Sequence, residues 1–231
     1  MWESQVDGRK LNFHLAGINN QNFIMRDEET GTWWQQVSGE AILGPMKGSK
    51  LKLVFHDELP FATWKVEQGR GRVLRPDVRV AGNYEKADWE EHMVRFPTVT
   101  PAAPDEPLPL RELIIGITIG EASRAYPRAA LKARTPVLDT LGSVPLLIVV
   151  GDDKKAVRAF DTRVDGRALE FFAKPDISPL RLVDKETGSE WDFVGKAVSG
   201  PLAGKSLSKI AVLADYWFDW KAYHPAGDIF R

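Results

Sequence analysis

Carboxylate, imidazole and amide side chains are the groups in this sequence that could act on a small molecule. Asp215 and Asp219 are four residues apart, so a helix would place both carboxylates on one face, where they could do acid–base work. His224 follows soon after them, and Gln35 and Gln36 offer amides in the N-terminal part of the chain. These five residues are the candidate catalytic residues of a small-molecule enzyme that uses neither a metal nor a thiol.

Residue types and spacing exclude or disfavour several other kinds of chemistry. The chain has no cysteine, which excludes disulfides, thiolate metal sites and cysteine nucleophiles. Its histidines, at positions 14, 56, 92 and 224, lack the spacing that brings two imidazoles to one metal ion, so we expect neither a metal site nor a cofactor. Residues 200–206 end in Gly-Lys-Ser like a phosphate-binding loop, but only three residues separate the glycines where that motif needs four.

Three tryptophans indicate a different class of function. Trp33 has Glu190 as its counterpart in a second, similar stretch, so we expect its ring to point outward, and we interpret Trp2 and Trp89 in the same way. No residue offers a nucleophile with a positioned base. We therefore favour a non-catalytic binding or structural subunit that presents an aromatic surface to a protein partner, and the enzyme is the alternative. A cavity that held the polar candidates and shifted their ionisation would reverse this preference.

The composition is that of an ordinary globular protein. The chain has 231 residues, of which 31 are basic and 32 acidic, and this balance gives no positive field for nucleic acid. The longest apolar run, residues 144–150, is far shorter than the roughly 20 residues of a membrane span. Because no basic segment followed by an apolar stretch begins the sequence, we expect no export signal and a soluble, cytoplasmic protein.

The elements that must position the candidate residues come from a stretch that occurs twice. The shared features are an Asp-Gly turn (7–8 and 165–166), a Thr-Gly turn (30–31 and 187–188) and a Gly-Pro-x-x-Gly loop (44–48 and 200–204). Few insertions separate the two copies, as expected when one structural unit is built twice. The sequence therefore predicts that residues 2–75 and 160–231 form the same fold.

Alternating apolar and polar residues predict antiparallel strands within this unit. Leu11, Phe13 and Leu15 alternate with polar residues and are expected to face a core. Trp34 and Trp191 occupy the same place in the two copies, so we expect both to anchor cores. The fold class predicted is mainly β (α+β), with two related antiparallel β-rich domains and short helices.

The repeat also sets the expected domain boundaries. Residues 1–75 form a first repeat that lacks its N-terminal half, and residues 112–231 form a second, complete repeat. Between them, residues 76–111 contain an amphipathic helix at 84–96 and a proline-rich linker. In the second repeat a short helical or coiled piece is expected at 123–132, and aromatic residues at helical spacing predict a helix near its C-terminus.

Several segments resemble a prokaryotic family catalogued as domain-of-unknown-function family 3179. The resemblance rests on residues 30–45 of the first copy and on 116–127, 139–145, 184–191, 197–204 and 217–225 of the second. It covers nearly all the chain except the linker and implies no established activity. Members of that family carry a cysteine-containing segment after the second buried strand, where this chain has Gly151-Asp152-Asp153.

The incomplete first copy leads to an expectation about partners. It lacks counterparts of the apolar strands expected at 113–119 and 144–150, and an unpaired sheet edge is usually covered or used. Three elements could cover this edge: the segment 112–160, which contains those strands, the helix at 84–96, or another chain. An uncovered face would leave an apolar patch near Leu11, Phe13 and Phe23. We therefore expect a protein partner or self-association.

Overall fold

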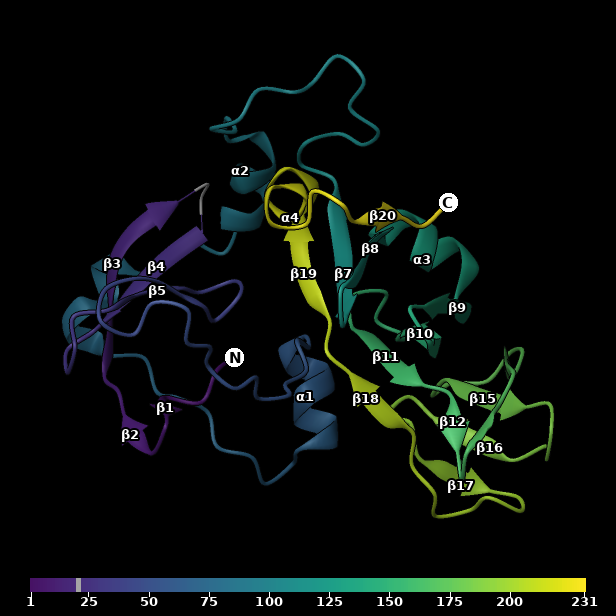
Figure 1. Ribbon diagram of the computed structural model, residues 1–231. Helices are drawn as coiled ribbons and strands as arrows, with labels where there is room; N and C mark the ends of the chain where they lie inside the picture. The colour runs from purple at the N-terminus through teal and green to yellow at the C-terminus, as the bar shows by residue number, and fades with distance from the viewer. Residues whose placement is uncertain (20–21) are drawn as a thin grey trace.

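The computed structural model describes residues 1–19 and 22–231 (Figure 1). It is mainly β, with antiparallel strands in several small sheets and few short helices, which confirms that part of the predicted fold class. In Figure 1 the N-terminal strands, in purple, lie on one side, and the green strands of the C-terminal half lie on the other. Within the described residues, no helix is long and apolar enough to cross a membrane.

Two four-stranded antiparallel sheets have the same meander order. The first consists of β3 (Phe13–Asn19), β4 (Asn22–Asp27), β5 (Trp33–Gln35) and β6 (Ala41–Leu43), and the second of β14 (Phe171–Ala173), β15 (Arg181–Asp184), β16 (Glu190–Asp192) and β17 (Ala197–Ser199). A two-stranded hairpin precedes each sheet: β1 (Gln5–Val6) with β2 (Arg9–Lys10), and β12 (Arg163–Val164) with β13 (Arg167–Ala168). In both hairpins the central Asp-Gly pair has positive φ angles, the geometry that tight hairpin turns require.

A buried hydrogen bond between tryptophan and aspartate anchors each four-stranded sheet. Trp34 Nε1 donates to Asp27 Oδ2 at 2.8 Å, and Trp191 Nε1 donates to Asp184 Oδ2 at 2.9 Å. None of these four residues is more than 1% exposed. The structure thus shows both tryptophans in cores, with the indole donor satisfied, as burial of Trp normally requires.

The first strand of the N-terminal sheet departs from the predicted alternation. Leu11 is 1% exposed, as expected, and Phe13 packs edge-on against Trp34 with ring centroids 5.9 Å apart. Leu15, however, is 61% exposed, so the expectation that it faces a core is wrong. The register shifts between Leu15 and Gly17, and such a bulge interrupts the inward and outward alternation on which the prediction depended.

The C-terminal half contains two further four-stranded sheets. Their elements, in chain order, are β7 (Leu113–Ile119), β8 (Ala122–Pro127), α3 (Arg128–Arg134), β9 (Val137–Leu141), β10 (Val144–Val150), β11 (Val157–Asp161), β18 (Ser208–Ile210), β19 (Leu213–Tyr216), α4 (Trp217–Tyr223) and β20 (Asp228–Ile229). The sheet orders are β18-β11-β10-β9 and β19-β7-β8-β20, and β20 runs parallel to β8. Apolar side chains from both sheets form one core.

The segment at 123–132 differs from the helical or coiled piece that the sequence indicated. Its first part belongs to strand β8, and helix α3 begins only at Arg128. The reason is the preceding turn: Gly120, with φ 59°, reverses the chain so that β8 pairs with β7 along its length. Pro127 then ends the strand and precedes the helix, a position that its fixed φ suits.

The first half ends in helices rather than strands. After extended chain, α1 (Phe61–Glu67) is followed by the 3-10 helix η1 (Val78–Asn83) and by α2 (Trp89–Arg95), which is shorter than the helix predicted at 84–96. In the described chain, residues 44–60 form only isolated bridges, such as that between Trp2 and Leu53. A strand needs a partner. In the C-terminal half β18 pairs with β11 and β19 pairs with β7, whereas the described part of the first half has no counterpart of β7 or β11.

The two halves contact each other through their helices. Asn22 of the first sheet donates a hydrogen bond to Asp219 of α4. Conversely, Thr63 of α1 donates from Oγ1 to Asp153 Oδ2 at 2.6 Å, in the turn that follows β10. Each helix therefore reaches the half of the chain to which it does not belong in sequence, and α4 brings its carboxylate to the N-terminal sheet.

Candidate functional site

The corner between β19 and α4 brings Asp215 and Asp219 together. Asp215 is in strand β19, and Asp219 lies in the first turn of α4, which begins at Trp217. The helix thus starts after Asp215, so the expectation that one helical face carries both carboxylates is wrong. The two groups nevertheless lie in hydrogen-bond contact, because the chain turns sharply from the strand into the helix.

One buried oxygen of these carboxylates accepts no hydrogen bond from the described residues. Asp215 Oδ1 accepts from the backbone N–H of Tyr216 at 2.7 Å, and the side-chain amide of Asn22 donates to Asp219 Oδ2. Asp219 is 6% exposed, and its Oδ1 is buried without a donor among the described residues. Asp215 is in hydrogen-bond contact with Asp219, so a proton on Asp215 would add a donor to this carboxylate. The geometry therefore favours a pair that holds one proton, because an unpaired buried carboxylate oxygen is costly.

Burial and mutual repulsion shift the ionisation of both groups. Burial, the largest cause, and the charge of Asp219 together raise the pKa of Asp215 from the usual 3.8 to about 7. Burial also raises the pKa of Asp219, to about 6, although the hydrogen bond from Asn22 acts to lower it. Two carboxylates in contact do not ionise independently, so they titrate as a unit. The pair can therefore donate or accept a proton near neutral pH.

A groove of about 430 Å³ opens beside Asp215. One wall comes from β7, β19 and α4, and the other from the first sheet and the extended segment before α1. The side chains that line it include Asn22, Gln36, His56, Glu58, Thr118, Asp215, Trp220 and His224. Glu58 is close enough to raise the pKa of Asp215 through its charge. The groove thus combines acidic, amide and imidazole groups at the contact between the two halves.

His224 is held in place at one end of this groove. Its ring stacks on that of Trp220, with centroids 3.6 Å apart and planes 14° apart. Its Nδ1 lies 3.1 Å from the carbonyl oxygen of Trp220, and its Nε2 lies 3.3 Å from Thr118 Oγ1. Burial lowers the pKa of His224, so the ring is neutral at pH 7. A neutral imidazole that donates from Nδ1 leaves Nε2 as an acceptor.

The two glutamines occupy different positions relative to the groove. Gln36 lines it, and Trp2 Nε1 donates to the backbone carbonyl oxygen of Gln36 at 2.6 Å. Gln35 accepts from Ser38 Oγ at 2.8 Å and also lies within hydrogen-bonding reach of Tyr223 on α4. The structure therefore brings Asp215, His224 and Gln36 to one groove, whereas Gln35 does not line it.

The three tryptophans proposed to bind a partner have different surroundings. Trp2 is half-buried, and its ring lies so close to Gly39 that a Cβ there would come within 2.8 Å of it. Trp33 is also half-buried, on strand β5. Trp89, the first residue of α2, is 47% exposed. Trp2 thus belongs to the wall of the groove, whereas Trp89 presents its ring to solvent.

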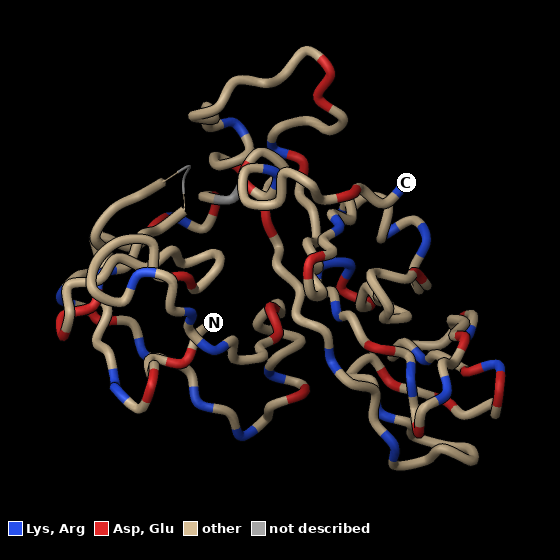
Figure 2. Tube along the Cα trace, in the orientation of Figure 1, with Lys and Arg blue, Asp and Glu red and all other residues tan. Residues whose placement is uncertain are grey.

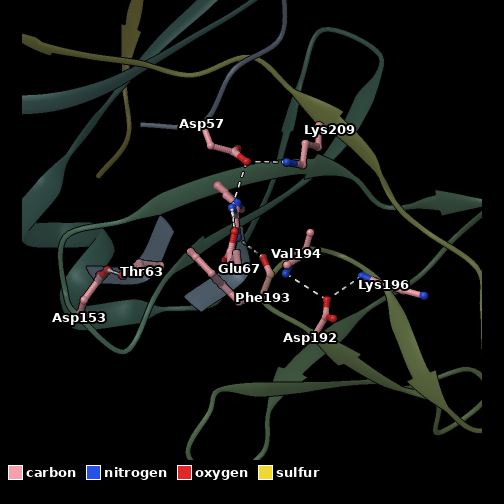
Figure 3. Close-up of polar contacts among 10 residues, drawn as sticks. Asp57, Thr63, Glu67, Asp153, Asp192, Phe193, Val194, Lys196 and Lys209 are labelled. Carbon is pink, nitrogen blue, oxygen red and sulfur yellow. Dashed lines mark hydrogen bonds and ion pairs between the residues drawn. The ribbon is translucent and has the colours of Figure 1, made fainter. Parts of the chain in front are cut away.

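A second polar cluster, centred on Arg158, was not predicted (Figure 3). Arg158 is 2% exposed, and its guanidinium forms two hydrogen bonds with Glu67, at 2.7 and 2.8 Å, and one with Asp57 at 3.0 Å. Its charge also lies 4.6 Å from the ring centroid of Phe193. Lys209 donates to Asp57 at 2.6 Å. The cluster is an internally paired contact between the halves, with little capacity left for a ligand.

Sequence reasoning missed other residues of the groove. Asn22, His56 and Glu58 carry no motif, and only the folded chain brings them near Asp215. Arg158 had one signal that could have been used: a charged residue inside an apolar strand must be paired when buried. Among the described residues, no group of three or more His, Asp or Glu side chains could hold a metal ion.

Comparisons with known proteins give one result. No curated protein and no solved structure matches the chain. A family model does match, and the match runs through both halves and the segment between them. By this match, which spans residues 1–227, the chain belongs to the protein family of unknown function DUF3179.

Proposed function

We propose that the groove beside α4 binds a small molecule and that Asp215 and Asp219 transfer a proton to or from it. The observation that carries this proposal is the contact between the two carboxylates, with Asp215 lining the groove. A carboxyl group that titrates near neutrality is suited to general acid–base catalysis, because it exchanges its proton at the working pH. Cavities that hold groups with perturbed ionisation are the usual candidates for active sites.

The geometry assigns distinct roles to the residues of the groove. Asp215 would exchange the proton with the ligand, and Asp219 would stabilise the protonated form of Asp215 by accepting its hydrogen bond. His224 would offer a neutral imidazole. Asn22 holds Asp219, and the side chain of Gln36 would bind polar groups of the ligand. These side chains can carry out acid–base chemistry without any thiol.

The test begins with the ionisation of the pair. Carboxyl ¹³C NMR should show Asp215 titrating near pH 7 in the wild-type protein and nearer its ordinary pKa in Asp219→Asn. A small-molecule library should then be screened by NMR chemical-shift perturbation for ligands that move groove resonances. Asp165→Asn is the matched control, because Asp165 is a surface carboxylate paired with Lys205.

Two results would reject the proposal. One is ionisation of both carboxylates below pH 5 in the folded wild-type protein. The other is a set of library ligands that perturb resonances elsewhere and leave the groove unchanged. Turnover that is lost in Asp215→Asn and retained in Asp165→Asn would instead establish the catalytic role.

A second candidate function is a non-catalytic subunit that presents aromatic and apolar surface to a protein partner or to another copy of the chain. Exposed side chains favour it: Phe23 is 48% exposed, Ile18 66% and Trp89 47%. Ile18 and Phe23 lie opposite each other on β3 and β4, and exposed apolar patches often mark interaction sites. Light scattering at micromolar concentration tests self-association, which Phe23→Ser should weaken. A clean monomer that captures no partner would leave the groove as the better-supported site.

We also infer that residues 2–75 and 160–231 are two versions of one structural unit. Support comes from the shared sheet order and from matched hydrogen bonds, in which Asp27 and Asp184 each bind a tryptophan seven residues later. An experimental structure in which Trp34 and Trp191 had unrelated surroundings would contradict this inference.

A further inference from the structure

A second cavity, of about 400 Å³, is lined by three basic side chains. Arg128 and Lys132 come from α3, and Lys155 comes from the turn between β10 and β11. The cavity and the groove beside Asp215 have Glu58, Val212 and Ala214 in common. Ala214 pairs with Ile115, which also lines this cavity. Because neighbouring strand residues point to opposite faces, this cavity lies on the face of β19 opposite to that of Asp215.

The three positive charges are concentrated without a matching ion pair. Figure 2 shows basic residues along α3, whose sequence Arg-Ala-Ala-Leu-Lys-Ala-Arg contains no acidic residue. Arg128 and Lys132 are four residues apart on one helical face, a like-charge spacing that destabilises a helix. Arg128 donates to the backbone carbonyl oxygen of Lys155, so the residue that carries the third charge is in contact with Arg128. Within the described chain, none of the three forms a salt bridge.

Two carboxylates lie nearby, and neither forms a salt bridge with the three cations. Asp153 is within electrostatic reach of Arg128, but its carboxylate accepts hydrogen bonds from Thr63 and from two backbone N–H groups. Glu58 lines both the cavity and the groove, and its carboxylate lies 3.8 Å from the ring of His56. The cavity therefore keeps an excess of positive charge beside apolar walls formed by Ile115, Val157 and Val212.

We propose that this cavity binds an oxyanion, namely the phosphate or carboxylate group of a small molecule. A guanidinium and two ammonium groups from different elements can surround such a group, and charge-assisted hydrogen bonds to it are strong. The bound anion would also relieve the repulsion among the three cations. The proposal is independent of the acid–base function, because Arg128, Lys132 and Lys155 line this cavity and do not line the groove beside Asp215.

The test measures binding of inorganic phosphate and of acetate by isothermal titration calorimetry and NMR at constant ionic strength, in the full chain. Phosphate is expected to bind with saturation and to shift the resonances of α3. Lys132→Gln and Lys155→Gln should each weaken binding about three- to tenfold, because each removes one charge near the anion. Glu58→Gln should strengthen it, since it removes an opposing charge. A preference for phosphate over acetate identifies the phosphate group, and the reverse identifies a carboxylate.

Controls separate this proposal from the one above. Lys50→Gln removes an exposed lysine of the N-terminal half and should leave phosphate binding unchanged. Asp215→Asn should leave it nearly unchanged as well, so the oxyanion site can stand if the acid–base proposal fails. Phosphate binding that fails to saturate, or that is equal in wild type, Lys132→Gln and Lys155→Gln, would overturn the oxyanion site.

Discussion

Replacing Asp215 by asparagine is expected to stabilise the protein, and to do so much more at pH 8 than at pH 4.5. Asparagine has nearly the same shape, and its amide can donate to Asp219 as protonated Asp215 does. What it removes is the unfavourable ionisation of a buried carboxyl group. The perturbation therefore removes the ionisation of Asp215 together with its repulsion of Asp219.

The sign and size of the effect come from the pKa shift. Folding raises the pKa of Asp215 from 3.8 to about 7, so between these values the unfolded chain loses a proton that the folded chain keeps. Wild-type stability therefore falls as the pH rises through this window. The raised pKa of Asp215 lowers the free energy of unfolding by about 1 kcal/mol at pH 4.5 and by about 4 kcal/mol at pH 8. The gain in Asp215→Asn should thus be up to about 3 kcal/mol larger at pH 8.

Urea unfolding of wild type and variant at both pH values measures this difference. Comparing the variant with wild type at each pH cancels the contributions of titrating groups that do not interact with Asp215. Asp165→Asn, which removes a surface carboxylate, is the matched control. The reasoning would be refuted by a gain that is equal at the two pH values, or by a variant that is less stable than wild type at pH 8.

Three further substitutions test the cores and the contact between the halves. Trp191→Ala should cost about 3–5 kcal/mol in urea unfolding, whereas Trp33→Ala, at a half-buried position, should cost much less, and equal losses would contradict the burial argument. Arg158→Met should destabilise by about 3–5 kcal/mol, because Glu67 would remain without its cation, and Arg158→Met with Glu67→Gln should recover part of that loss. Gly200→Ala should lower the melting temperature, because Gly200 has φ 85° and an added Cβ would lie 2.6 Å from Ser189; an unchanged melting temperature would refute this close approach.

The features that the sequence predicted correctly depend on local patterns. The Asp-Gly turns, the core tryptophans and the helix near the C-terminus each depend on residues adjacent in the chain, and α4 covers 217–223 as the aromatic spacing indicated. The family resemblance was confirmed by the match to residues 1–227. Leu15 was misplaced because a bulge depends on pairing with the neighbouring strand, which alternation alone does not reveal.

The candidate site could be predicted only in part, because it is assembled from distant segments. The sequence pointed to Asp215 and Asp219 as a pair, although for a helical reason that the structure does not support. Asn22 reaches Asp219 across 197 residues, and Glu58 acts on Asp215 through space. Such neighbours follow from how the two halves pack, and that packing is not encoded in any single motif.

The position of Arg158 has a consequence for how the molecule unfolds. Its carboxylate partners lie in the N-terminal half, whereas the arginine itself extends from a strand in the core of the C-terminal half. Separating the halves would break all three hydrogen bonds from this guanidinium to Asp57 and Glu67, so opening of the N-terminal half while the rest stays folded is expected to be costly. Although the apolar side chains form separate clusters, the chain should melt in one cooperative transition, with equal calorimetric and van't Hoff enthalpies.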